Sequence, residues 1–163
     1  MQKKYIVITL FIIASIIAGA ITYNRYAEKK YIESVRGITN DMMNTYSISK
    51  SITEHYAEVW QKGIDNGSDL NQTMMNTMEE AAQQIKSADS ILNIINVQIS
   101  TIHSVPSKYS TLHQNIAELY TLVNQLHQLS KQPQGSFNSF TAAKITNQAA
   151  VELLYQKIKK ELQ

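Results

Sequence analysis

One stretch of the chain repeats apolar residues in alternating steps of four and three, and this repeat constrains the fold more than any other feature. It runs from Met74 to Ile102 without a miss. Such spacing places apolar side chains along one stripe of an α-helix that packs in coiled-coil style. We therefore predict a long helix over about residues 70–104. Its apolar stripe consists of Met74, Met78, Ala81, Ile85, Ala88, Leu92, Ile95, Ile99 and Ile102.

Three further helices follow from the same spacing and from the turn residues that interrupt it. Asp, Asn, Gly and Ser at 65–69 end a first helix, Pro106 ends the second, and Gly135 lies in the loop before the last. The chain has five glycines and two prolines, too few for the tight turns of a sandwich or barrel. We predict an all-α fold, in which an N-terminal transmembrane helix leads into an elongated antiparallel bundle of three to four helices. The expected bounds of the bundle helices are about 25–64, 70–104, 107–131 and 139–162.

The same periodicity predicts which side chains of these helices are buried, and Ser136 or Ser139 is expected to cap the last helix. The first helix carries Val35, Ile38, Met42, Ser49, Ile52, Tyr56 and Val59; the third carries Tyr109, Leu112, Ile116, Leu119, Val123 and Leu126; the fourth carries Phe140, Ala143, Ala150, Leu154 and Ile158.

The N-terminal segment, residues 1–24, is an apolar run with basic flanks. Tyr5 to Tyr23 contains no charged residue, and as a helix it spans about 27 Å, close to the roughly 30 Å of a bilayer's hydrocarbon core. Tyrosines at both ends are typical of membrane interfaces. We predict a membrane anchor that holds the remaining residues, 25–163, as an extracytoplasmic helical body.

A cleaved signal peptide is the alternative interpretation of this segment. Small residues at Ala18, Gly19 and Ala20 suit signal peptidase, and cleavage there would release a secreted body. Against cleavage, the apolar run continues into Ile21 with no polar or turn-forming region before the site. The short basic start followed by an apolar run places the body outside the cytoplasm under either interpretation.

Charge and residue content exclude several classes of function. Residues 1–30 hold five basic residues and one acidic residue, so the basic pI near 8.7 belongs to this segment and the body lacks the basic stripe that binds nucleic acid. With no cysteine and no metal-ligand spacing among the four histidines, which we expect at the surface or rim, we predict no metal and no cofactor. No catalytic motif is present, so we predict that the protein is not an enzyme.

The turn between the first two helices carries the candidate binding residues. Because the first two predicted helices are longer than the last two, the far end of their hairpin is expected to extend beyond the others. Aromatic residues and Met are enriched at the cores of protein interfaces. The alternative is that these residues only close the end of the bundle. The candidate partner-binding tip consists of Trp60, Ile64, Leu70, Met74 and Met75.

In layout the chain resembles two known groups of proteins. A basic start, one membrane segment and a cysteine-free helical body are similar to the four-helix sensor domains of chemoreceptors and sensor kinases, which place a second membrane helix after the bundle. They also resemble the small membrane-anchored superinfection-exclusion proteins that temperate phages of Gram-positive bacteria give their hosts. That resemblance implies blocking of DNA entry by related phages at the cell surface, and it carries over no functional residue.

Three hypotheses of function follow. The first is an anchored module that binds or blocks a protein partner at the cell envelope. The second is a secreted helical effector or inhibitor, released by cleavage after Ala20. The third is a structural homo-oligomer or sensor-like bundle.

Overall fold

The computed structural model describes the backbone of residues 2–163 apart from 68, 103 and 104, and the side chains from Thr22 onward with the same gaps. These residues form four α-helices and one short 3-10 helix, and no strand occurs among them. The all-α prediction is confirmed. The elements are α1 (Gln2–Asn66), α2 (Leu70–Ser100), η1 (Ser107–Tyr109), α3 (Ser110–Lys131) and α4 (Phe137–Glu161).

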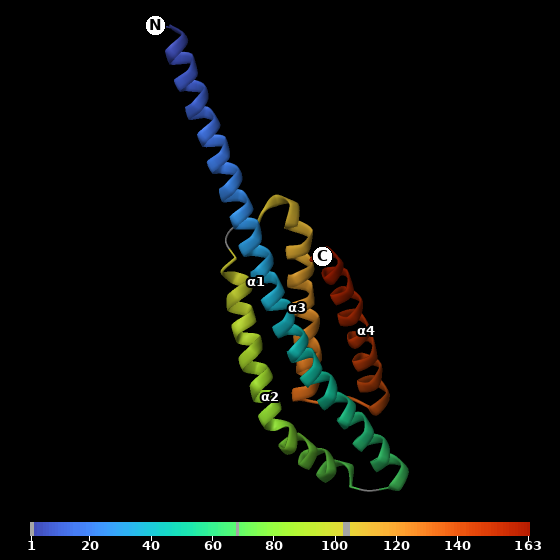
Figure 1. The fold of residues 1–163 in the computed structure, drawn as a ribbon. Coiled ribbons are helices and arrows are strands. Elements are labelled where there is room, and N and C mark those ends of the chain that lie inside the picture. The colour runs from blue at the N-terminus through green and yellow to red at the C-terminus, as the bar shows by residue number, and fades with distance from the viewer. Residues whose placement is uncertain (1, 68, 103–104) are drawn as a thin grey trace.

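The helices form an elongated bundle around α1 (Figure 1). Helix α1 packs against α2, α3 and α4, and α3 packs against α4. The short connections make sequential helices antiparallel, and toward the N-terminus α1 extends beyond the other helices (Figure 1). At the opposite end, the hairpin of α1 and α2 extends past the connection between α3 and α4 (Figure 1).

The predicted membrane span falls largely outside the residues with described side chains. Among the residues whose side chains the structure describes, no helix is both long and apolar enough to cross a membrane. The predicted anchor runs from Tyr5 to Tyr23. For its residues 5–21 the structure describes only the helical backbone of α1 and no side chain.

Several helix bounds differ from those predicted. Helix α1 ends at Asn66 and not at 64, and the predicted third helix begins with the 3-10 turn η1, so that α3 starts at Ser110 and not at 107. Helix α2 ends at Ser100 and not near 104, where the N–H of Ile102 bonds to the carbonyl oxygen of Ile99, only three residues earlier, and tightens the end of the helix. Helix α4 begins at Phe137 and not at 139. Ser136 is its N-cap, and Ser139 completes a capping box. In this box the hydroxyl oxygen of each serine accepts a hydrogen bond from the backbone N–H of the other.

The core consists of two clusters that follow one another along the bundle. The larger cluster joins all four helices and includes Val35, Leu92, Ile116 and Ile158. The smaller one lies toward the α1–α2 turn and centres on Tyr56. Most predicted stripe residues are buried or half-buried, but Ala143 is exposed, and Val151 is buried although the spacing selected Ala150.

Helix α1 buries several hydroxyl groups on its core face. Thr39, Thr45 and Thr53 are buried, and each donates to the carbonyl oxygen four residues earlier, at 2.7 to 3.1 Å. This bonding satisfies the hydroxyl without a partner from another helix. Ser49 lies on the same face and instead meets a side chain of α3.

Candidate functional site

The turn between α1 and α2 is fixed by backbone conformation and by a helix cap. Gly67 has a φ of 63°, a left-handed conformation that a side chain disfavours. Asp69 then caps α2, where its Oδ1 atom accepts from the backbone N–H groups of Asn71 and Gln72 at 3.0 and 3.2 Å. The hairpin tip is therefore held at both sides of the turn.

The predicted tip residues separate into packed and exposed ones. The ring of Trp60 lies 6.2 Å from that of Phe137 and 5.8 Å from that of Phe140, so the start of α4 covers Trp60. The expectation that the whole tip stands free is therefore wrong for Trp60. Met74 also packs against the smaller core cluster, and Leu70 is half-buried. The exposed apolar surface of the tip is supplied by Ile64 and Met75, which are 49% and 57% exposed.

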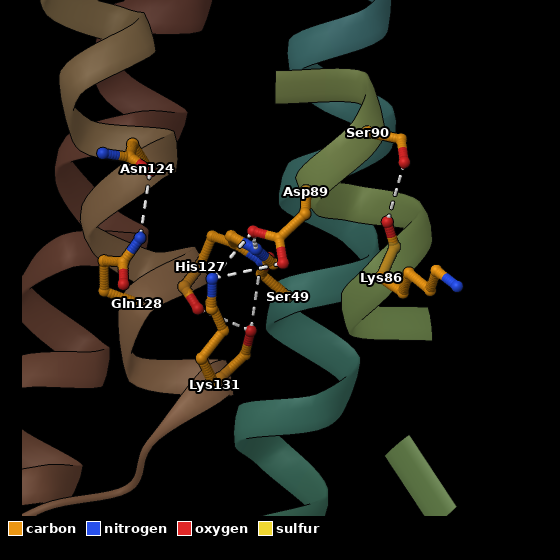
Figure 2. Close-up of polar contacts among 9 residues, drawn as sticks. Ser49, Lys86, Asp89, Ser90, Asn124, His127, Gln128 and Lys131 are labelled. Carbon is orange, nitrogen blue, oxygen red and sulfur yellow. Dashed lines mark hydrogen bonds and ion pairs between the residues drawn. The ribbon is translucent and has the colours of Figure 1, made fainter. Parts of the chain in front are cut away.

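A buried polar network joins three helices midway along the bundle (Figure 2). The Nε2 atom of His127 on α3 lies 2.9 Å from Oδ1 of Asp89 on α2, and its Nδ1 atom lies 3.2 Å from the hydroxyl of Ser49 on α1. Lys131 donates to both carboxylate oxygens of Asp89 at 2.9 and 3.1 Å. Because the carboxylate only accepts, Nε2 is the donor of this pair, and Nδ1 of a neutral ring accepts from Ser49.

The network lies between the two core clusters and sets the charge state of Asp89. The larger cluster reaches Tyr46 on α1, whereas the smaller one starts at Ile52, so the Ser49 layer separates them. Burial alone raises the pKa of the Asp89 carboxyl, but the hydrogen bonds from Lys131 and His127 outweigh it and hold the pKa below its ordinary value. Asp89 is therefore a carboxylate at neutral pH.

Serine, histidine and aspartate are also the residues of a hydrolase triad, but this arrangement lacks a triad's access. Ser49 and His127 have no exposed surface, so a substrate cannot reach the serine hydroxyl. The contacts of these residues instead link α1, α2 and α3.

The prediction that the histidines lie at the surface or rim is wrong for His127. Its ring is fully buried because it lies four residues after Val123, on the core face of α3. On α3 the periodicity analysis counted apolar residues alone and passed over it. On α1 the predicted stripe already included Ser49, but the spacing did not indicate that its partner is a histidine of α3.

A second polar cluster lies on the surface between α1 and α4. The hydroxyl of Tyr46 donates to Oε1 of Glu152 at 2.6 Å, and Lys50 donates to the same oxygen at 2.9 Å. Burial, and then the bond to Glu152, raise the pKa of Tyr46 to about 12. The two donors lower the pKa of Glu152. This cluster links the two helices.

The outward face of α4 carries an apolar stripe that the sequence analysis missed. Ile145 and Leu153 are 58% and 76% exposed, and Ala142 and Ala149 are exposed beside them. At 100° per residue these positions fall within an arc of about 80° on the helix. Helix α4 thus has apolar residues on two faces, and only the face with Phe140, Val151, Leu154 and Ile158 meets the core.

A cavity of about 860 Å³ lies at the end of the bundle nearest the N-terminal segment. One wall is α1, and the other is formed by the end of α2 together with Thr101, Ile102, Pro106 and Ser107. Its polar lining is mostly uncharged. The lining includes Tyr23, Tyr26, Lys30, Gly37, Gln98 and Thr101.

No group of three or more acidic, histidine or cysteine side chains that could hold a metal ion occurs among the residues that the structure describes. No protein-family model, curated protein or solved structure matches the chain.

Proposed function

We propose that the protein is a non-enzymatic, membrane-anchored module whose helical body lies outside the cytoplasm and binds a protein partner of the cell envelope. The observation that carries this proposal is the continuity of α1. It is a single helix from Gln2 to Asn66, so the backbone of the apolar run passes without a break into the bundle. From Tyr23 to Tyr31, a residue of the larger core cluster, the helix rises about 12 Å, so an anchor that ends at Tyr23 would hold the body close to the membrane surface.

Continuity favours retention of the segment over cleavage. Cleavage after Ala20 would cut inside α1 and leave the new first turn with unpaired N–H groups and no cap. A retained helix instead forms one rigid element from membrane to tip, which fixes the orientation of the body. This suits a module that presents a surface to a neighbouring protein.

The exposed apolar side chains that are available for the partner include two groups at different places on the bundle. Ile64 and Met75 lie at the end of the bundle far from the anchor, and Ile145 and Leu153 lie along its side. Several exposed apolar residues that lie together on an otherwise polar surface indicate a contact site more often than a single exposed apolar residue does. We propose the stripe on α4 as the main contact, because its residues are contiguous on one helix face.

The state of the chain in its native type of host tests the anchor. We expect the full-length mass in the membrane fraction. A chain that begins at Ile21 and is recovered from the supernatant would contradict the anchor and favour a secreted effector.

Photo-crosslinking tests the partner surface. With a photoreactive residue at Leu153, we expect a discrete adduct with an envelope protein. The matched control is the same residue at Glu79, which is exposed on α2. Equal crosslinking at both positions, or none at Leu153, would contradict a contact on α4.

We propose phage superinfection exclusion as the process, on the resemblance in layout alone. A host that expresses the chain should adsorb a related phage normally yet form fewer plaques. The variant with Ile145 and Leu153 both changed to Asp should restore plaque formation if this face binds the partner. Normal plaque numbers with the unchanged chain would contradict this process and leave the anchor in place.

A further inference from the structure

We propose that the cavity at the anchor end of the bundle binds the headgroup of an anionic lipid that carries hydroxyl groups. This inference rests on the proposed membrane anchor, because the anchor would bring the cavity next to the lipids of that membrane. The cavity measures about 860 Å³ and begins at Tyr23, the last residue of the apolar run. It therefore opens where the helix would leave the hydrocarbon core, in the headgroup layer.

The charges at the cavity favour an anion. Among the residues that line the cavity, Glu28 is the acidic one. Its Oε2 atom lies 2.6 Å from Nζ of Lys108, and this ion pair neutralises its charge. Lys30 lines the same cavity, and no acidic group among the described residues pairs with it. A phosphate oxygen near the Lys30 ammonium would form a charge-assisted hydrogen bond.

The remaining polar lining suits hydroxyl groups. Asn24, Ser34 and Gln98 line the cavity, and amide and hydroxyl groups both donate to and accept from alcohols. Helix α2 ends at this wall, and the negative end of its dipole disfavours a second phosphate there.

Gly37 leaves open space on the α1 wall of the cavity, although helix packing does not require a glycine at this position. A Cβ atom at this position would meet nothing within 4 Å, so no neighbouring helix forces a glycine here. A glycine inside a helix is unfavourable compared with alanine, and its use is explained when a ligand approaches the backbone closely.

Native mass spectrometry of the full-length chain in detergent micelles tests the site. The micelles would contain equal amounts of phosphatidylinositol, phosphatidylserine and phosphatidylcholine. The first two carry the same net charge, so the comparison sets the hydroxyl groups of inositol against the ammonium and carboxylate groups of serine. We expect one phosphatidylinositol to be retained in preference to the other two lipids.

Two variants connect retention to the cavity. Lys30→Gln removes one charge-assisted hydrogen bond and should weaken retention about tenfold. Gly37→Phe fills the space at the α1 wall and should abolish it. The matched controls are Lys86→Gln and Ala82→Phe, both exposed on α2 and outside the cavity lining. Circular dichroism should show that Gly37→Phe and Ala82→Phe both keep the helix content of the unchanged chain and unfold cooperatively.

Retention of all three lipids alike, or of phosphatidylserine as well as phosphatidylinositol, would overturn the proposal. Equal retention by the four variants would also overturn it. Flotation of the chain with vesicles is measured separately. If flotation fails while selective retention persists, the anchor is wrong and the site stands; if flotation succeeds without selective retention, the site is wrong and the anchor stands.

Discussion

The Nε2 atom of His127 lies 2.9 Å from Oδ1 of Asp89, and the imidazole that makes this contact is completely buried. Together with the bond from Ser49, it places one polar layer across α1, α2 and α3. In helical bundles, a buried polar contact of this kind favours one register, since any shift leaves its groups unpaired. We therefore interpret the layer as the element that aligns these helices lengthwise.

Asp89→Ala should destabilise the bundle by about 1–3 kcal/mol, because it leaves the buried Nε2 donor without a partner. The control is Glu79→Ala, an exposed change on the same helix, which should alter stability by less than about 0.5 kcal/mol. Urea unfolding followed by circular dichroism gives both values. If the two variants unfold at the same urea concentration, the contact contributes no net stability.

The free energy of unfolding should fall at acidic pH. Hydrogen bonds lower the pKa of Asp89 and of Glu152 in the folded chain. A carboxyl with a lowered pKa contributes stability above its unfolded pKa, near 4, and this contribution is lost as pH falls through the folded value. The urea midpoint should therefore stay level from pH 7 to about 5 and fall below about 4.

The variant Asp89→Asn isolates one part of this pH dependence. It removes a titrating group whose folded and unfolded pKa values differ, so the urea midpoint should depend less steeply on pH below about 4. Glu79→Gln is the matched control and should leave the slope unchanged. The effect is modest, since the Asp89 side chain is partly exposed and solvent screens its ion pair. An unchanged slope in Asp89→Asn would contradict the role of its hydrogen bonds.

The apolar repeats predicted the helices well, because buried positions on a bundle helix recur every three or four residues and apolar residues show this spacing in the sequence. On α3, the stripe from Leu112 to Leu126 is buried as expected. On α4 the prediction of buried positions was poorer. That helix has apolar residues on two faces, so its sequence does not tell which face meets the core, and Ala143 was assigned to the wrong one.

The polar layer and the packing of Trp60 were not predictable from local sequence. The partners of His127 lie 38 and 78 residues away, on two other helices. Trp60 meets Phe137 and Phe140, which belong to the start of α4. Such contacts depend on how far each helix reaches along the bundle. An error of a few residues in helix length decides whether a tip residue is free or covered.

Alanine substitutions at two glycines should have opposite effects. Gly37→Ala should stabilise the chain by roughly 1 kcal/mol, because it is helical and its new Cβ meets no atom within 4 Å. Gly135→Ala should destabilise it by about 1 kcal/mol or more, since Gly135 has a φ of 86° and its Cβ would lie 2.6 Å from Oγ of Ser139. Thermal melts measure both changes. A lower melting temperature for Gly37→Ala would show that the α1 wall is more crowded than described.

Two residues of the tip should separate folding from binding. Trp60→Ala removes a half-buried indole from between α1 and α4 and should cost about 1–3 kcal/mol. Met75→Ala changes an exposed side chain and should alter stability by less than about 0.5 kcal/mol. Urea unfolding followed by circular dichroism at 222 nm compares the two. If Trp60→Ala unfolds like the unchanged chain, the indole does not support the fold and becomes a candidate for partner binding. If Met75→Ala destabilises the chain by as much as Trp60→Ala, the turn end of α2 packs more tightly than its exposure indicates, and the tip offers no free surface there.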